Sequence, residues 1–343
     1  MIHLLLTRAH AYTLQQYLDT WGRDVRPFFR PLFYDDLAFG ADLKPGTYIF
    51  ADLERLDDAG MELARLAWDR LAARPADFRL LNDPSKVLLR YDLLRELHAA
   101  GINRFAAHRM NNGSLPKRFP VFLRRASEHD GALSALIHSP EELERAAAEL
   151  VARGAPPGDL LAVEYCETAD DAGIYRKYSA FRVGEHVMAR HLFHSRKWVL
   201  KKADLVDPGF VEEERVYLTE NPHERELRRV FDLAHIEYGR MDYSVLDGVV
   251  QVWEINTNPM IAVPPCRTVP DRLLGQGLFA RQLQTAFESA DHAGVSGPPQ
   301  RIIVPASLAR RLGVTLRTRA ARSLARSLEA AARRLRAVDP RSE

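Results

Sequence analysis

The stretch that most constrains this chain is "GRMDYSVLDGVVQVWEINTNP", residues 239–259, in which two strand-like runs flank an Asp-Gly turn. Their alternation predicts an antiparallel hairpin whose side chains divide between two faces. Asp242, Glu254 and Asn256 stand at strand positions where apolar residues would be expected. A buried carboxylate is costly unless it is paired or bound to a cation, so the hairpin predicts a charged site.

The length of the turn at Asp247 decides whether the two acids share a face. A two-residue turn would pair Leu246 with Val249 and send Asp242 and Glu254 to opposite faces. A three-residue loop ending at Gly248 would return both acids to one face, within diagonal reach, with Asn256 two residues further on. Both arrangements suit the sequence, so a shared face is a prediction.

If they converge, two carboxylates and one amide oxygen form an oxygen-only set. Such a set suits Mg²⁺ or Mn²⁺, particularly when nucleotide phosphates fill the remaining positions. The competing interpretation is that Asp242 and Glu254 make structural pairs with neighbouring arginines or backbone N–H groups. The sequence contains no Walker P-loop and no G-x-G-x-x-G fingerprint, so no other nucleotide fold is indicated.

The rest of the chain predicts a mixed architecture. Strands alternating with helices near the N-terminus indicate a small parallel α/β unit. We expect strands at 2–7, 46–53, 119–125 and 159–167, a hairpin at 175–195, and helices at 59–74, 85–100, 139–154 and 222–238. Residues 293–300 are rich in Gly and Pro and read as a linker.

The order of these parts resembles that of the ATP-grasp superfamily, most closely its RimK-like and D-alanine–D-alanine ligase-type carboxylate–amine ligases. In that family a metal-binding hairpin carries Asp, a turn, and then Glu-x-Asn with a nearby Pro, and the resemblance runs from about Leu80 to Pro264. It implies an α/β (α+β) ATP-grasp fold. The implied parts are an N-terminal α/β domain (1–80), a small lid subdomain with its preceding helix (81–165), a large subdomain with the hairpin (166–292), and a linker with a basic helical tail (293–343).

The resemblance also implies roles for individual residues. It gives the metal to Asp242, Glu254 and Asn256. It places Arg90, with Lys86 as the alternative, and Arg124 where the family has phosphate-binding lysines; arginine keeps the charge but changes the hydrogen-bond geometry. The loop "ASEHDGALS" stands where the family covers the phosphates, although it has one Gly where several are common.

Adenine and ribose contacts are implied in "LLAVEYCE". Glu164, Tyr165 and Cys166 would line the base, and Glu167, Asp170 or Asp171 would meet the sugar. Lys177 substitutes for an arginine that the RimK-like pattern has at the position of Ser179.

Further cations are implied for substrate and transition state. Arg190, Arg196 and Lys197 are candidates for an anionic substrate or the γ-phosphate, and we expect Arg196 and Arg240 to be catalytic, Arg240 as a transition-state arginine. The sequence "NTNPMI" lacks a Gly that many relatives have in the second-substrate loop.

The implied reaction is amide formation through an acyl phosphate, with release of ADP and phosphate, from small-molecule or peptide carboxylates and amines. The cofactors would be ATP and Mg²⁺ or Mn²⁺. Two alternatives stay open: an ATP-grasp kinase that phosphorylates a hydroxyl, and a nucleotide-binding adaptor without turnover.

Composition bounds the partners and the compartment. Two cysteines and no signal-peptide or membrane-spanning pattern indicate a cytoplasmic protein. A formal net charge of +2 says nothing about partners by itself, and we expect no specific nucleic-acid partner. From Leu308 onward, however, the sequence contains ten arginines and only three acidic residues, and leucines recur at near-helical spacing. This tail predicts a helix that docks on the body or on a second subunit of a homodimer, or alternatively one that meets an anionic membrane surface or polyanionic partner.

Overall fold

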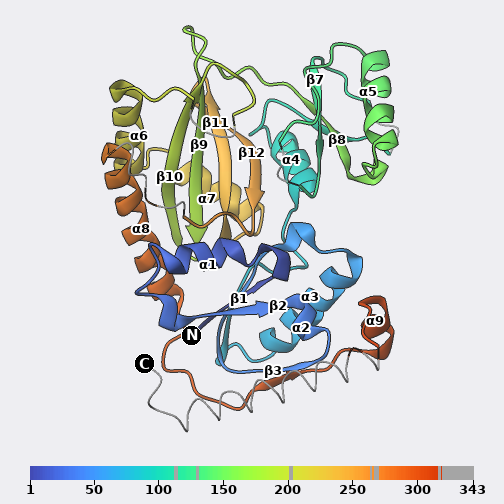
Figure 1. Cartoon of the computed structure of the whole chain (residues 1–343), viewed down its shortest axis with the longest axis vertical. Helices are drawn as coiled ribbons and strands as arrows, with labels where there is room; N and C mark the ends of the chain where they lie inside the picture. Colours follow the sequence, from blue (N-terminus) through green and yellow to red (C-terminus); the bar gives the residue numbers. More distant parts are fainter. Residues whose placement is uncertain are drawn as a thin grey trace, which may run out of the picture.

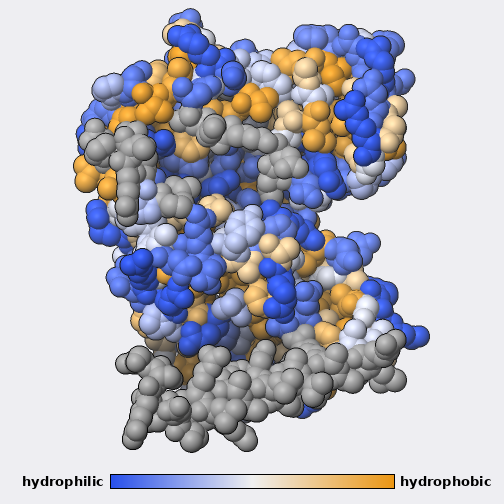
Figure 2. Space-filling view, viewed as in Figure 1, coloured by the Kyte–Doolittle hydropathy of each residue, from blue (hydrophilic) through white to orange (hydrophobic). Residues whose placement is uncertain are grey.

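The computed structural model of the chain describes residues 1–111, 115–128, 131–200, 204–262, 265, 270–315 and 318. Figure 1 shows three parts: an N-terminal domain below, a large antiparallel sheet at the upper left, and a smaller sheet with α4 and α5 at the upper right. In Figure 2 a deep indentation separates the small upper lobe from the N-terminal domain. The predicted mixed α/β fold class, with one parallel sheet and separate antiparallel sheets, is confirmed.

The N-terminal domain is built on a parallel sheet of order β2-β1-β4-β5. Its strands are β1 (Ile2–Leu6), β2 (Phe29–Phe33), β4 (Gly46–Phe50) and β5 (Phe78–Leu81). Helices α1 (Tyr12–Asp19), α2 (Tyr34–Leu37) and α3 (Asp58–Ala72) accompany it, with 3₁₀ turns Arg8–His10, Arg26–Phe28 and Leu53–Arg55. Because the chain leaves β1 toward β2 while β4 pairs on the other side, β1 and β4 form a topological switch point, where ligand crevices of such sheets usually open.

The segment after residue 293 returns to this domain. Strand β13 (Gln300–Ile302) pairs antiparallel with β3 (Ala41–Leu43), and α9 (Ala306–Arg311) packs on α3 with Leu308 buried. Leu312 also lies against the same core. The start of the predicted tail therefore docks on the body, whereas its remaining leucines lie outside the described residues.

The small subdomain has a three-stranded antiparallel sheet of order β6-β8-β7. It comprises α4 (Arg90–Ala99), β6 (Ala107–Arg109), β7 (Val121–Arg125), α5 (Pro140–Ala152), a 3₁₀ turn at Pro157–Asp159 and β8 (Leu160–Glu164). The prediction that a helix begins at Ser85 is wrong. The Asp83 carboxylate accepts from the Ser85 N–H at 2.9 Å, and Leu88 donates to the Ala234 carbonyl at 3.0 Å, so this segment is committed to other contacts and α4 starts at Arg90.

The large sheet is antiparallel throughout, in the order β10-β9-β11-β12. Its strands are β9 (Tyr175–Val183), β10 (His186–Ser195), β11 (Tyr238–Leu246) and β12 (Val249–Asn256), so the hairpin predicted at 175–195 is confirmed. Helices α6 (Pro208–Glu220), α7 (Glu224–Leu233) and α8 (Pro270–Ala290) contact β10, and α6 also packs on α8 at the left of Figure 1. Helix α7 is shorter than the predicted 222–238 because it ends at Leu233, where His235 takes a left-handed φ of +54° and the Ile236 N–H donates to the Phe231 carbonyl at 3.0 Å.

Within the part of the chain that is described, no helix has the length and apolar character needed to cross a membrane.

Candidate functional site

The hairpin combines a short turn with a bulge. Leu246 pairs with Val249, and Asp247 and Gly248 have φ values of +51° and +75°, so the turn has two residues, both left-handed, and the three-residue loop is wrong. The ladder then shifts: Tyr243 faces Val252, but Asp242 faces Glu254. Trp253 is the extra residue, and this bulge restores the parity that the short turn would have broken. Asp242 and Glu254 therefore lie opposite each other on one face.

These two acids lie at the floor of a cleft between the small subdomain and the large sheet. The cleft encloses about 880 Å³ of empty space including its mouth. Aromatic side chains of Phe122, Tyr165, Trp198 and Trp253 line its walls, and its polar lining includes Arg124, Arg176, Lys177, Asp242 and Glu254. Trp198 packs on Phe122 with ring centroids 5.0 Å apart. An apolar cleft with a few convergent charged groups is the usual form of a ligand site.

Two arginines converge on Glu254. Arg90 at the start of α4 and Arg124 on β7 each place a guanidinium nitrogen near the same carboxylate oxygen, at 2.6 Å and 2.5 Å. Burial lowers the pKa of Arg124, an effect that Glu254 opposes. Arg90 also donates to the carbonyls of Arg125 and Ala126 at 2.7 Å and 2.9 Å, which fixes the start of the loop predicted to cover the phosphates. Lys86 instead pairs with Asp83 at 3.3 Å and is exposed, so Arg90 is the residue of the two that reaches the site.

Asp242 is buried and has three polar neighbours on its own sheet. Lys177 and the Ser179 hydroxyl each contact the carboxylate at 3.0 Å, and the Arg240 Nε lies 3.1 Å away. Burial alone would raise the pKa of Asp242, but Arg240 and Lys177 hold it below its ordinary value. Asp242 is thus an anion that the fold keeps charged.

In this structure Asp242 and Glu254 both form ion pairs with neighbouring cations, as the competing interpretation expects. Among the described residues no group of three or more His, Cys, Asp and Glu side chains is arranged to hold a metal ion. The donor chemistry still fits a hard cation, because Asp242 and Glu254 face each other and Asn256 shares their side of β12. The Asn256 side-chain oxygen accepts from the Asn258 N–H at 2.8 Å, which leaves it a second lone pair.

The residues expected around the nucleobase divide into two groups. Tyr165 and Cys166 line the cleft, and burial raises the pKa of the Cys166 thiol. Glu167 accepts from the hydroxyls of Tyr165 and Tyr175 at 2.7 Å and 3.1 Å, at the same side of the cleft. Glu164 is buried elsewhere: its carboxylate accepts from the Ala106 N–H at 3.1 Å, which fastens β8 to the chain before β6.

Arg196 and Lys197 follow β10 but do not line the cleft. Arg196 is exposed and donates to the Ala172 carbonyl at 3.1 Å, so the structure does not bring it to Asp242 or Glu254. Trp198, one residue further, does line the cleft and was missed by the sequence reasoning. The signal available was a short apolar run, Trp198-Val199-Leu200, between basic residues, which is weak taken alone.

Arg190 and Arg240 line a second cavity on the other side of Asp242. It encloses about 820 Å³ of empty space, and it shares Lys177 and Asp242 with the first cleft. Its remaining lining comes from β10, the segment that follows β12, α6 and α8: His191, Phe193, Glu214, Leu218, Met260, Arg272 and Gln276. We refer to it below as the second cavity.

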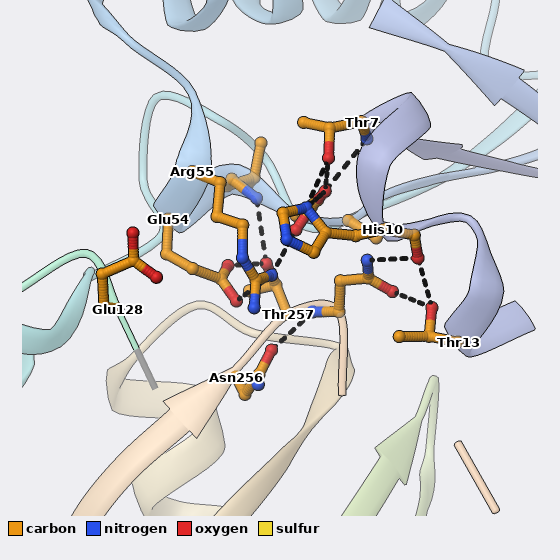
Figure 3. Close-up of polar contacts among 12 residues, drawn as sticks. Thr7, His10, Thr13, Glu54, Arg55, Glu128, Asn256 and Thr257 are labelled. Atoms are coloured by element: carbon orange, nitrogen blue, oxygen red, sulfur yellow. Dashed lines mark hydrogen bonds and ion pairs between the residues drawn. The ribbon is translucent and has the colours of Figure 1, made fainter. Parts of the chain in front are cut away.

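A polar junction joins the end of β12 to the N-terminal domain (Figure 3). Thr257 accepts from the Leu53 N–H at 3.0 Å and donates to the Glu54 carboxylate. The Thr13 hydroxyl donates to Asn258 at 2.8 Å. The junction lies beside the switch point of the parallel sheet, so it fixes the β11–β12 hairpin against the N-terminal domain.

No family model and no curated protein matches the sequence. Solved structures that resemble the chain include a D-alanine–D-alanine ligase from Bacillus anthracis, with 12% identity and a TM-score of 0.48 over 84% of this chain and 96% of that one. An L-amino acid ligase from Bacillus licheniformis has 10% identity and a TM-score of 0.41 over 87% and 77%. A RimK domain ATP-grasp protein from Sphaerobacter thermophilus has 13% identity and a TM-score of 0.44 over 82% and 99%. At these identities and TM-scores, a function can be inferred only from the chain's own side chains.

Proposed function

We propose that the protein is an ATP-dependent carboxylate–amine ligase that forms an amide through an acyl phosphate. The observation that carries the proposal is the pair Asp242 and Glu254, brought face to face at the floor of an aromatic-walled cleft and surrounded by cationic side chains. The cleft's polar lining contains three cations and two acids, and Arg90 adds a fourth cation through Glu254. This balance favours a polyanion that arrives with a divalent cation.

The ion pairs of Asp242 and Glu254 would change partners when the substrates bind. In this state Arg90 and Arg124 compensate Glu254, while Lys177 and Arg240 compensate Asp242. When a triphosphate enters, its oxygens would take over the cations, and the two carboxylates with Asn256 would be released to hold Mg²⁺ or Mn²⁺. The bound metal would neutralise phosphate charge and align the phosphates.

The chain's own residues would then serve two bond exchanges. A substrate carboxylate oxygen attacks the γ-phosphorus, the bond to the bridging oxygen of ADP breaks, and an acyl phosphate forms. An amine nitrogen next attacks the acyl carbon, phosphate leaves with the bonding electrons, and the nitrogen loses a proton. Arg124 and Arg240 would stabilise the charge that spreads over the transferring group, and no protein nucleophile is required.

Base and sugar would occupy the outer part of the cleft. Tyr165, Trp198 and Phe122 offer ring faces and edges for an adenine, and Glu167 stands at the end of the tyrosine pair where a ribose hydroxyl could be accepted. The aromatic walls also exclude water, which protects an acyl phosphate from hydrolysis.

The direct test is product analysis. The protein is incubated with Mg·ATP and pooled amino acids, peptides and metabolites, and products are identified by mass spectrometry. ADP, phosphate and a new amide support the ligase. A stable phosphoester with ADP would indicate the kinase instead, and ATP binding without ADP release across the screen would indicate the adaptor.

A further inference from the structure

We propose that the second cavity is the acid subsite and that it selects an acid with a second anionic group, which pairs with Arg190. The inference rests on the proposed ligase function, because it takes the reacting carboxylate to lie beside Asp242, which the two cavities share. It goes further by stating the class of acid: a dicarboxylate or an acid of equivalent double charge.

Strand β10 contains a bulge at Arg190. Ala189 faces Ala180 across the β9–β10 ladder, but His191 faces Ser179, so Arg190 is an extra residue. Both Arg190 and His191 line the second cavity, although neighbours in a regular strand would point to opposite faces. The bulge therefore places two polar side chains in one cavity. In the same way, the bulge on β12 places the neighbours Trp253 and Glu254 in the first cleft.

Arg190 and His191 are both buried, and the hydrogen bond between them fixes which nitrogens donate and which accepts. Arg190 and His191 are 7% and 8% exposed. Arg190 donates to the His191 Nδ1 at 2.8 Å, and because a guanidinium can only donate, that nitrogen is the acceptor. Burial, together with neighbouring arginines and Lys177, lowers the pKa of His191 well below its ordinary value, so the ring is neutral and its proton is on Nε2.

Both residues keep a buried donor without a partner among the described residues: the Arg190 Nε–H and the His191 Nε2–H. A buried donor left unsatisfied is costly, and two of them in one cavity indicate an acceptor that binds there. Burial and the nearby Arg240 also lower the pKa of Arg190 to about 9, and an anion in the cavity would reverse that effect.

The positive charges that line the second cavity outnumber the negative ones. Arg272 pairs with Glu214 at 2.7 Å, and Lys177 and Arg240 share Asp242. Arg190 donates to the His191 ring and, at 3.4 Å, to the Met260 carbonyl, and its guanidinium lies 5.4 Å from the centroid of the Phe279 ring. None of these partners is a carboxylate, so in the described part of the chain no ion pair compensates its charge. The lining has four cations and two acids, an excess of positive charge that favours an anionic ligand, and Arg190 is the cation among them that no acid pairs with.

Together these observations separate two anion positions. One lies at the shared wall, beside Lys177 and Arg240, where a carboxylate meets the γ-phosphate. The other lies at Arg190 and His191. A monocarboxylate would satisfy the first position and leave the buried donors of the second unpaired, which is how a polar pocket rejects an analogue that lacks one group.

The test compares matched acids on the full chain by isothermal titration calorimetry, in low salt with Mg·ADP present. Succinate is compared with butyrate, and glutarate with pentanoate, so that each pair differs by one carboxylate. We expect at least one diacid to bind about tenfold or more tightly than its partner. Equal affinities within both pairs would overturn the proposal, and this comparison needs no variant.

Variants then assign the preference to Arg190. Arg190→Gln should remove the diacid preference, and Arg190→Lys should restore part of it. Arg215→Gln, an exposed arginine on α6 that pairs with Glu212, should retain it and serves as the control. A preference that survives intact in a folded Arg190→Gln protein would overturn the role of Arg190. If the diacid preference is present but the product screen yields no amide, the anion selectivity is supported while the ligase function fails.

Discussion

Asp242 on β11 lies directly opposite Glu254 on β12, because Trp253 is an extra, bulged residue between Val252 and Glu254. Without that extra residue, the two-residue turn at Asp247 and Gly248 would turn one carboxylate away from the other. The site therefore depends on two local irregularities that compensate each other. This relationship can be tested through the acids and through the residues that surround them.

Replacing Glu254 by Gln should lower ATP turnover by about 10²–10³-fold, because the variant loses the carboxylate proposed to hold the metal. The amide oxygen of Gln can still accept from Arg90 and Arg124, so the loss of unfolding free energy should stay near 1–3 kcal/mol, within the ~5–15 kcal/mol of a typical domain. ADP release and urea unfolding are measured together. Asp247→Asn, at the exposed tip of the same hairpin, is the control, and wild-type turnover in Glu254→Gln would defeat the site assignment.

Replacing Arg124 by Met should weaken Mg·ATP binding by about 10–100-fold, because the variant loses a buried cation that we propose to contact the phosphates. Calorimetric titration with a non-hydrolysable ATP analogue measures the affinity without turnover. Arg145→Met, an exposed arginine on α5 in the same subdomain, controls for loss of surface charge. An unchanged dissociation constant in Arg124→Met would show that the phosphates bind elsewhere.

The charged positions of the hairpin could be predicted from the sequence because polar residues interrupt an apolar alternation there. The bulges at Trp253 and Arg190 could not be, since a bulge leaves no mark in a period-two pattern when the extra residue is aromatic or charged. Of the two candidate cations, Arg90 contacts Glu254 and Lys86 does not, while a phosphate-binding role for Arg90 stays a prediction. The helix that carries Arg90 begins later than predicted, because the Asp83 carboxylate accepts from the Ser85 N–H.

The misplaced residues have a common physical cause. Glu164 directly precedes the cleft-lining Tyr165, and Arg196 lies two residues before the cleft-lining Trp198. Strand alternation and the end of β10 nevertheless turn Glu164 and Arg196 toward backbone groups of other segments. The second cavity could not be predicted from the sequence, because its lining combines β10 with α6 and α8 and depends on how these distant segments pack.

Thr257→Val should uncouple the hairpin from the N-terminal domain. The substitution keeps the shape but removes the acceptor for the Leu53 N–H and the hydroxyl that donates to Glu54, so we expect a loss of about 1–2 kcal/mol in unfolding free energy. Thr219→Val is the matched control, since the Thr219 hydroxyl bonds only within α6. Equal stabilities of the two variants in urea would contradict a structural role for the junction.

His3 should make the N-terminal domain sensitive to mild acid. Burial, with the N-terminal amino group and Arg30 nearby, lowers the pKa of His3 to about 4, and its ring stacks on Tyr48 at 4.5 Å. The unfolded chain takes up this proton near pH 6.5 and the folded chain only near pH 4, so unfolding free energy is lost as the pH falls through that window. The shift corresponds to at most about 3 kcal/mol.

The variant His3→Phe keeps the stacked ring and removes the titration. Its stability relative to the wild type should therefore rise steadily as the pH is lowered from 6.5 to 4, and stay constant above pH 7. Urea midpoints at pH 7.5, about 5.5 and about 4.5 measure the difference, and His138→Gln, an exposed histidine, provides the control. A difference between His3→Phe and wild type that is the same at every pH would mean that His3 is not the group that titrates.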